Sequence, residues 1–579
     1  MPAEARFFAP KVLGADFELG NFILRDRGGI GRDGTGDLAA RKLLAEIPGV
    51  SAWRRRQYGL WSSGYGGYDQ YGSAQSGSVS DGYGDGHGDA DGYGRSYASS
   101  PGVYGIQYGG YGGGSSSWSG YGYNEQDRER RFLASNGGCA YIDLSHLELC
   151  VPEVTNARDF VAAYHAMLRI GQGAMTRAQA GLDPGEVLEV LVNNSDGLSN
   201  SYGSHLNFLV TRQLWDDLMG RRPHYLAFLA SHQVSSIVYT GQGKVGSENG
   251  RAPVGYQLAQ RADFFETLCA QQTTYQRPII NSRNESLCGK RDDDYARLHH
   301  IFTDAGLAQV ATYLKVGTMQ LVLAMLEAGD VDLSLLVDDP VSAVVEISHD
   351  PWLEQRVPLA QGGSATALQI QRGLLEAALR HDDRTGFPTV PGAEDILLCW
   401  QDTLDRLDTG ELAAVSDRLD WAAKLEWIEL ARAESAEAGT ELEWGSDELK
   451  HLDLLYSSLD PARGLYWLYE RAGAFHSVVE DAEIERFTHE PPDDTRAWTR
   501  AMLLRQFGPA GEVDRVDWDR VVVEATADDG ATRRLEISLD DPLGNTRADN
   551  EALFARGTQA SAANDSNNGD DNPISRSTT

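Results

Sequence analysis

Acidic residues recur at two-residue spacing near the start of the chain, and this spacing suits metal chemistry. Asp16 and Glu18 lie in a segment of alternating apolar and polar residues. Side chains two positions apart on a strand point to the same face, so the two carboxylates would lie side by side. Neighbouring carboxylates repel each other unless a cation lies between them, and hard divalent ions such as Mg²⁺ prefer oxygen ligands. Considered alone, the pair is better explained by an exposed strand face, and a metal site is the functional interpretation.

A second polar group follows in the segment CAYIDLSHLELCVPE. Tyr141 and Asp143 have the same strand-like spacing, and Glu148 comes soon after them. Farther along, His205 and Asn207 share the face of another predicted strand. A carboxylate held by a strand can activate water or attack a carbonyl carbon directly. The alternative for a single histidine is a structural role.

Basic residues near predicted strand ends form a third set. Arg261, Arg277 and Arg283 each lie close to acidic or amide residues, and His299 belongs to the run Arg297–His300 before a long helix. Guanidinium groups bind phosphate oxygens with two hydrogen bonds at once, so this set suits a phosphate ligand. Considered singly, structural ion pairs and a solvated helix entry explain these residues better.

The elements that would position these residues form an α+β fold. Alternating or β-rich runs predict strands at 12–24, 139–144, 187–192 and 206–210, and a late hairpin of 521–524 against 533–537. Helical spacing predicts helices at 156–170, capped by Thr155 or Asn156, and at 305–328, 365–380, 393–407 and 419–431. A helical region therefore follows a mixed one.

The charge balance excludes two broad classes of function. The 579 residues include 51 Lys+Arg and 85 Asp+Glu, a formal net charge of −34. Such a chain does not coat nucleic acid, which needs clustered cations, nor does it adhere to anionic membranes. No secretory signal is visible, and the five scattered cysteines show no zinc spacing. We therefore expect a cytoplasmic protein with no nucleic-acid or membrane partner.

Glycine is concentrated in one segment. Residues 58–123 contain 21 of the 63 glycines and 12 of the 24 tyrosines, with almost no aliphatic residues. This composition predicts a flexible low-complexity insert, and residues 557–579 are predicted to be a disordered tail. The GxGxxG match at 29–34 lacks a βαβ context and is interpreted as a loop.

Taken in order, several motifs resemble those of the Pup ligase/depupylase (PafA and Dop) family. The family's opening GxExE is similar to 14–18, NGARxYxD to 136–143, HPE to 146–148 and NSYGSHEN to 200–207. RPIINTRDE resembles 277–285, RLHxI 297–301 and STYLKxGT 311–318, while DWxAKL, GLY and PPxDTRA resemble 420–425, 464–466 and 491–497. The resemblance covers nearly all of 12–57 and 124–550.

This resemblance implies a glutamine-synthetase-like catalytic domain, with an antiparallel sheet cradle packed by helices, over 1–57 and 124–505. It also implies a small C-terminal domain over 506–556, with the insert at the position of the inserted loop in Dop-type members. The cofactors would be Mg²⁺ and ATP, or ADP with phosphate. Asp143 would be the catalytic acid. The metal would bind Asp16, Glu18, Glu148 and His205, and the nucleotide would bind Tyr141, Arg261, Arg277, Arg283 and His299.

The spacing between Asp143 and Glu148 resembles the Dop branch more closely. The resemblance therefore implies an amidase that cleaves the isopeptide bond between a Pup-like modifier and a substrate lysine. A ligase that joins such a modifier to lysine is the alternative within the same chemistry. A non-catalytic scaffold that assembles through the Gly/Tyr insert is the alternative from another class. The oligomeric state does not follow from the sequence.

The chain also departs from the family motifs. Asp16 stands in place of a Glu, Cys139 of an Arg, Leu206 of a Glu, Asn284 of an Asp and Leu287 of a His. The nucleotide and metal residues are nearly complete, whereas groups around them differ. These departures bear on the identity of the modifier more than on nucleotide binding, and a relative of Pup fits them.

Overall fold

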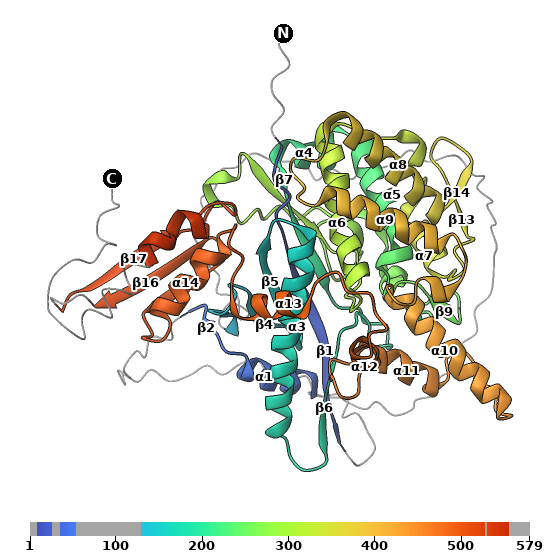
Figure 1. Ribbon diagram of the computed structural model, residues 1–579, viewed down its shortest axis with the longest axis horizontal. Helices are drawn as coiled ribbons and strands as arrows, with labels where there is room; N and C mark the ends of the chain where they lie inside the picture. The colour runs from blue at the N-terminus through green and yellow to red at the C-terminus, as the bar shows by residue number, and fades with distance from the viewer. Residues whose placement is uncertain (1–7, 26–34, 54–128, 527–529, 555–579) are drawn as a thin grey trace, which may run out of the picture. The chain divides into compact units, whose positions relative to one another are not determined.

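Figure 1 shows the computed structural model of the protein, which describes residues 8–25, 35–53, 129–526 and 530–554. The GxGxxG match, the insert at 58–123 and the tail at 557–579 lie outside the described residues. None of the described helices has both the length and the apolar character needed to cross a membrane.

An eight-stranded antiparallel sheet organises the structure (Figure 1), with strand order β12-β7-β1-β5-β4-β3-β2. The remaining strand, β6, pairs with the second half of β1. The strand bounds are β1 Leu13–Arg25, β2 Val50–Ser51, β3 Arg131–Phe132, β4 Cys139–Asp143, β5 His146–Val154, β6 Glu186–Leu191, β7 Ser204–Thr211 and β12 Tyr295–His300. The four early predicted strands are thus confirmed to within a few residues.

Alternation along β1 separates a buried face from a polar one. Leu13, Ala15, Phe17 and Leu19 belong to the main hydrophobic core. The Phe17 ring lies 4.7 Å, centroid to centroid, from the ring of Tyr164 in helix α3 (Ala157–Ala180). The residues between them, including Asp16 and Glu18, point to the opposite face. The helices therefore cover one side of the sheet and leave the acidic side for the site.

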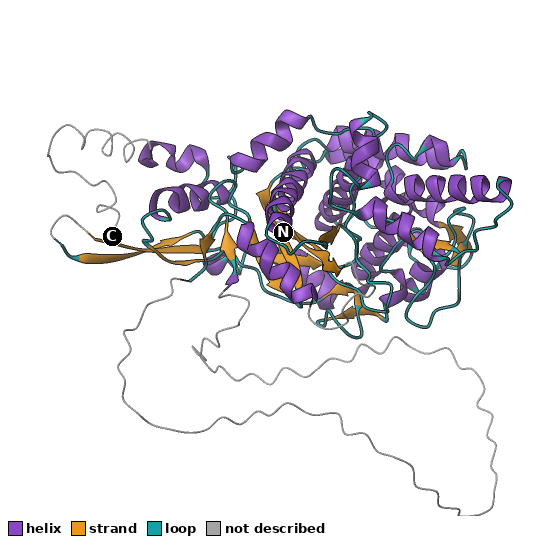
Figure 2. Cartoon of the chain, turned by 90° about the horizontal axis from the view of Figure 1, so that it is seen from below, coloured by secondary structure: helices purple, strands orange, loops and turns teal. Residues whose placement is uncertain are grey.

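The helices carry the end signals that the sequence predicts. Helix α3 follows Asn156, whose side-chain oxygen accepts a hydrogen bond of 2.8 Å from the Asp159 backbone N–H. The other long helices are α1 Thr35–Glu46, α5 Pro223–Thr240, α6 Gln309–Ala328, α8 Ala367–Thr385, α9 Ala393–Leu407 and α10 Asp420–Glu437. The shorter helices are α4 Arg212–Asp216, α7 Pro340–Ser348, α11 Asp447–Ser457, α12 Leu465–Arg471, α13 Asp481–His489 and α14 Ala497–Phe507. Figure 2 shows how the helices gather along the strands.

Helix α6 begins four residues later than predicted. It ends as expected before Gly329, which has a left-handed φ of 82°. At its start, the Asp420 carboxylate accepts hydrogen bonds of 2.9 and 3.0 Å from the backbone N–H groups of Leu307 and Ala308. These bonds hold the preceding residues outside the helix, so the first helical residue is Gln309.

The run 297–300 forms the end of strand β12 (Tyr295–His300), so the alternative of a solvated helix entry is wrong. β12 pairs antiparallel with β7, which places His299 opposite Asn207. Leu298 is buried in the core, whereas Arg297 and His299 line a cavity on the polar face. The alternation of polar and apolar side chains in this run was therefore a strand signal.

The C-terminal region forms a three-stranded antiparallel sheet of β15 Val513–Val516, β16 Arg520–Thr526 and β17 Thr532–Ser538. This confirms the predicted hairpin, since Val521 pairs with Ile537. The sheet and α14 share a hydrophobic cluster with Phe132, Cys139 and Cys150 of the large sheet. Because this cluster spans both regions, the domain boundary at 505/506 stays a prediction. Small two-stranded sheets pair β8 Lys244–Val245 with β9 Tyr256–Gln257, β10 Thr267–Ala270 with β11 Pro278–Asn281, and β13 Arg356–Pro358 with β14 Ser364–Thr366.

Candidate active site

Strand register gathers most of the predicted site residues into one stripe across the polar face. Asp16 on β1 pairs with His205 on β7, and Glu18 on β1 pairs with Glu148 on β5. Glu148 in turn pairs with Tyr141 on β4. Residues directly opposite each other in antiparallel strands have adjacent side chains. The short β4–β5 hairpin, β1 and β7 therefore bring distant parts of the sequence to one place.

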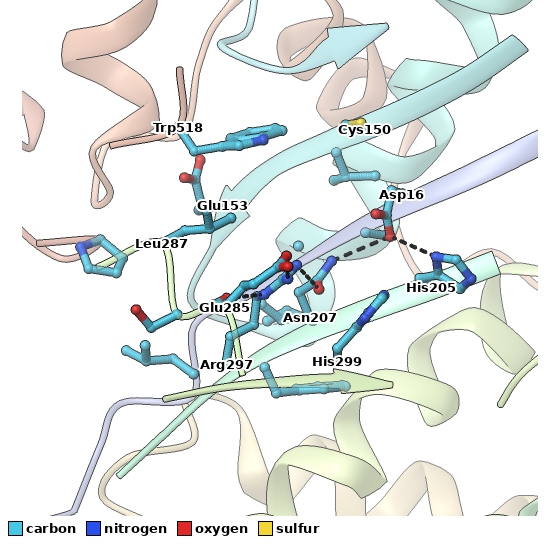
Figure 3. Close-up of a pocket in the computed structure, with 18 of the residues that line it drawn as sticks. Asp16, Cys150, Glu153, His205, Asn207, Glu285, Leu287, Arg297, His299 and Trp518 are labelled. Atoms are coloured by element: carbon cyan, nitrogen blue, oxygen red, sulfur yellow. Dashed lines mark hydrogen bonds and ion pairs between the residues drawn. The ribbon is translucent and has the colours of Figure 1, made fainter. Parts of the chain in front are cut away.

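One end of the stripe is a mixed carboxylate and imidazole group. Asp16, His205 and His299 each offer a ligand atom, and these atoms lie within 4.8 Å of one another. Figure 3 shows Asp16 directed toward His205, with a distance of 3.6 Å between Oδ1 and Nδ1. Asn207 donates a hydrogen bond of 3.4 Å to the same carboxylate oxygen. This geometry suits a divalent cation with oxygen and nitrogen ligands.

The imidazoles of this group are held neutral. Burial, reinforced by His299 and Arg261, lowers the pKa of His205 well below its ordinary value. Burial, with Arg297 and Arg283 nearby, does the same to the pKa of His299. A neutral imidazole has a free lone pair, so both rings can act as ligands to a metal ion.

The other end of the stripe contains three carboxylates. Ligand atoms of Glu18, Asp143 and Glu148 lie within 4.8 Å of one another. Glu18 accepts a hydrogen bond of 2.7 Å from the Gly203 backbone N–H and lies 2.9 Å from Nδ1 of His146. These contacts hold its carboxylate beside the other two acids.

Burial of these acids makes their charges costly. Burial, with repulsion from Glu18, raises the pKa of Asp16 to about 6. Burial, with repulsion from Asp16 and Glu18, raises the pKa of Glu148 well above its usual range. Burial and the charge of Glu148 likewise raise the pKa of Tyr141. A bound cation would reverse this cost, so the cluster has the electrostatics of a cation site.

The predicted basic residues divide between the cavity wall and the layer beside it. Arg283 and His299 line the cavity, whereas Arg261 and Arg277 are buried next to it. Arg261 donates to the Ile301 carbonyl oxygen. Arg277 donates hydrogen bonds of 2.9 Å to the carbonyl oxygens of Thr273 and Ser201. Burial, with repulsion from Arg277, lowers the pKa of Arg261 to about 9.

Several buried nitrogen atoms in this basic set make no hydrogen bond to any described residue. They are both ring nitrogens of His299, Nε of Arg261 and Nη1 of Arg277. Buried polar groups normally have partners, because leaving one unsatisfied costs about 1–3 kcal/mol. A phosphate-bearing ligand needs hydrogen-bond donors for its oxygens next to the residues that bind its metal ion. The unsatisfied nitrogens and the acidic cluster provide this combination. The residues present therefore fit a metal-bound nucleotide.

Except for Glu18, the residues of the stripe line a cavity of about 660 Å³. This cavity is also lined by residues that sequence reasoning did not assign to the site. Arg297 donates a hydrogen bond of 2.9 Å to Asn207 and bonds the Glu285 backbone oxygen at 2.6 Å. The spacing of Arg297 and His299 on one strand could have identified this arginine. The other unassigned residues are far apart in sequence and carry no shared motif: Arg130, Glu153, Glu285, Arg496, Asp517 and Trp518.

The wall opposite the stripe is held by a buried ion-pair group. Figure 3 shows Glu153 and Trp518 on this side of the cavity. Glu153 accepts from Arg496 at 2.8 Å and also pairs with Arg500. Although burial opposes ionisation, Arg500 and Arg496 lower the pKa of Glu153 to about 2. This group fixes β5 to the region around α14.

The departures from the family motifs fall in different places. Leu206 is buried in the core on the face opposite His205, so it does not touch the cavity. Asn284 is exposed and accepts a hydrogen bond of 3.1 Å from Arg212. Leu287 lines the cavity with a left-handed φ of 55°. Cys139 pairs with Cys150 across β4 and β5, two residues before Tyr141.

Comparison with known proteins identifies the family. A profile of the Pup-ligase protein family matches residues 114–522. The chain is 38% identical over 419 residues to a depupylase of Acidothermus cellulolyticus, covering 72% of this chain and 79% of the relative. It is 36% identical to a Pup deamidase/depupylase of Mycolicibacterium smegmatis, covering 73% and 80% of the two chains. A Pup–protein ligase of Acidimicrobium ferrooxidans is 35% identical, with 72% and 88% covered.

Solved structures agree with this assignment at the level of the fold. A Pup ligase PafA in complex with Pup matches with a TM-score of 0.69 and 23% identity, covering 98% of each chain. A PafA structure in complex with ADP matches with a TM-score of 0.65 and 27% identity, covering 76% of this chain and 91% of that one. The predicted α+β fold is confirmed and matches that of PafA, and the chain belongs to the Pup ligase family.

Proposed function

We propose that this protein is a nucleotide- and Mg²⁺-dependent amidase that hydrolyses the isopeptide bond between a Pup-like modifier and a substrate lysine. The observation that carries the proposal is the pair of metal-ligand-type clusters on one face of the sheet, with Asp143 a member of the one formed with Glu18 and Glu148. The 38% identity to a depupylase supports the hydrolytic direction. A cytoplasmic, reducing setting is part of the proposal and is consistent with five free cysteines.

The proposed roles follow the chemistry of each side chain. Asp16, Glu18, Glu148 and His205 would hold Mg²⁺, and Tyr141, Arg261, Arg277, Arg283 and His299 would hold the nucleotide. When bound, the metal and nucleotide would supply a fixed field that stabilises negative charge at the attacked carbonyl oxygen. The unsatisfied nitrogens of His299, Arg261 and Arg277 support this assignment, because a phosphate would give them partners.

Asp143 is the proposed catalytic residue. It ends β4, lines the cavity and lies beside Glu18 and Glu148. As a general base, its carboxylate would take a proton from the water that attacks the isopeptide carbon, and the lysine amine would leave as that proton is passed on. As a nucleophile, it would attack the same carbon and displace the lysine amine, which leaves with a proton, and water would then hydrolyse the acyl link to free the Asp143 carboxylate. Both routes yield a free carboxylate on the modifier and a free lysine.

The proposal is tested with purified protein, ATP, Mg²⁺ and a modifier–substrate conjugate. We expect release of the intact modifier, and we expect Asp143→Asn to abolish cleavage while nucleotide affinity changes by less than about tenfold, because Asp143 does not belong to the nucleotide-binding set. Absence of cleavage by the wild-type protein with nucleotide bound would exclude an amidase of this specificity.

Ligation is the second candidate, because Pup–protein ligases are similar to this chain at 35% identity. The same cavity would then join a modifier's terminal carboxylate to lysine at the expense of ATP. The two functions differ in their products. Stoichiometric ATP turnover coupled to a new modifier–lysine adduct, without cleavage of the conjugate, would favour the ligase.

A further inference from the structure

Arg130 occupies a defined position over the candidate site. β3 pairs with β4 so that Phe132 lies opposite Cys139 and Arg131 opposite Ala140. One step farther in the same register, Arg130 lies across from Tyr141. Its guanidinium carbon is 4.7 Å from the centroid of the Tyr141 ring, and its side chain lines the cavity. The backbone holds this position, because the Arg130 carbonyl oxygen accepts a hydrogen bond of 2.8 Å from the Ala52 N–H.

The position next to Arg130 has lost a cation. Cys139 stands where the family motif has arginine, and its side chain projects on the same face of β4 as Tyr141. Residue 139 is therefore the diagonal neighbour of Arg130 across the β3–β4 pair. Diagonal neighbours are about 7–8 Å apart at their Cα atoms, a span that an arginine side chain covers. Arg130 can thus bring a guanidinium to the region that an arginine at 139 would reach.

The Arg130 guanidinium adds a positive charge to an acidic side of the cavity. The β4–β5 side of the cavity presents Asp143 and Glu148, whereas the cavity-lining cations Arg283, Arg297 and Arg496 come from other parts of the wall. A substrate that brings an anionic oxygen to this side of the cavity would be attracted by a fixed guanidinium there. Guanidinium groups match carboxylate and phosphate oxygens in geometry as well as in charge.

We propose that Arg130 contacts the substrate, binding an anionic oxygen beside Asp143 in place of the motif arginine that is absent at Cys139. This inference rests on the proposed function for its substrate. The oxygen belongs either to a nucleotide phosphate or to a carboxylate of the modifier, and the two sources are separable by experiment.

The chain offers a matched control in Arg131. It is the same residue type and the next residue along the chain, but it is not among the residues that line the cavity. Its Nη1 donates hydrogen bonds of 2.9 and 3.3 Å to the carbonyl oxygens of Ile47 and Ala45, at the end of α1. Arg131→Gln therefore changes charge and strand composition as Arg130→Gln does, without altering the site.

The experiment compares wild type, Arg130→Gln, Arg131→Gln and the double variant Arg130→Gln/Cys139→Arg. Each folded variant, verified by its melting temperature, is titrated by calorimetry with ADP and Mg²⁺, and by fluorescence anisotropy with a labelled C-terminal peptide of Pup. Loss of one charge-assisted contact should weaken one of these affinities by roughly 10- to 100-fold in Arg130→Gln. Arg131→Gln should stay within about twofold of wild type.

The two sources of the anionic oxygen give different patterns. A phosphate contact weakens ADP binding in the absence of peptide, whereas a carboxylate contact weakens peptide binding and raises KM for a conjugate while ADP binding is unchanged. Partial recovery of the weakened affinity in the double variant supports replacement of the motif arginine. Equal ADP and peptide affinities in Arg130→Gln and Arg131→Gln would overturn the inference. If wild type cleaves no conjugate, the proposed function is wrong. The ADP and peptide titrations still test whether Arg130 binds an anionic oxygen.

Discussion

Replacing Asp16 with Asn should stabilise the metal-free protein and weaken its response to Mg²⁺. The Asp16 carboxylate is largely buried, with 21% of its side chain exposed, and it lies close to Glu18 and Glu148. Without a cation, its negative charge is unfavourable in the folded state. Asparagine keeps the shape of the side chain and removes the charge. The opposite signs of the two effects distinguish a cation site from an ordinary polar face.

The magnitude follows from the pKa of Asp16. Burial and Glu18 raise it from 3.8 to about 6. At 1.36 kcal/mol per pKa unit, keeping Asp16 ionised costs the folded state at most about 3 kcal/mol. Because the folded pKa is above the unfolded one, wild-type stability falls as pH rises through this interval and then levels off. The gain for Asp16→Asn should be near zero at pH 4 and about 1–3 kcal/mol at pH 8.

Urea unfolding at pH 4, 6 and 8, in EDTA and in excess Mg²⁺, measures both effects. Asp293→Asn serves as the control, because Asp293 is exposed and should give no pH-dependent difference. In Mg²⁺, ligand binding stabilises the folded state by mass action, and wild type should gain more than Asp16→Asn. The reasoning is wrong if Asp16→Asn is less stable than wild type at pH 8 in EDTA, or if Mg²⁺ stabilises both proteins equally.

Two further changes test the framework that positions the site. Glu153→Gln should cost about 3–5 kcal/mol in urea unfolding at pH 7, because it leaves Arg496 and Arg500 buried without their counter-charge. With a folded pKa of about 2, the Glu153 contribution in wild type is complete above its unfolded pKa and should disappear as pH falls toward 2. Asp420→Ala should cost about 2–5 kcal/mol, because Leu307 and Ala308 lose their acceptor. Calorimetric melting measures this cost. An unchanged melting temperature would contradict the prediction, because it would mean that water replaces the Asp420 carboxylate as the acceptor.

The sequence predicted the stripe because strands have a side-chain period of two. Asp16 with Glu18 and Tyr141 with Asp143 are close in the chain, so local spacing already places each pair on one face. His205 required only the same rule on a third strand. Helix ends were predictable where a local signal exists, as at Asn156 before α3 and Gly329 after α6. The start of α6 was misplaced, because the contact that decides it comes from Asp420, which is distant in the sequence.

The far wall of the cavity could not be predicted in the same way. Glu153, Arg496 and Trp518 share no spacing, and their proximity depends on how the C-terminal sheet packs against β5. The same holds for Arg130, which the charged run at 127–131 contains among other acids and bases. Only the register of β3 against β4 shows which residue of that run faces the site.

Register also decides which departures from the family motifs bear on chemistry. Leu206 lies between His205 and Asn207 in sequence, yet its side chain is on the core face, where exchanging Glu for Leu alters packing. Cys139 shares its strand face with Tyr141, and its side chain is buried in the hydrophobic cluster beside the cavity, so a cysteine in place of arginine there leaves one charge fewer next to the site. A motif read as letters gives these two changes equal weight. The strand register shows that, of these two, only the change at Cys139 lies next to the site, and Arg130 is the residue that can compensate for it.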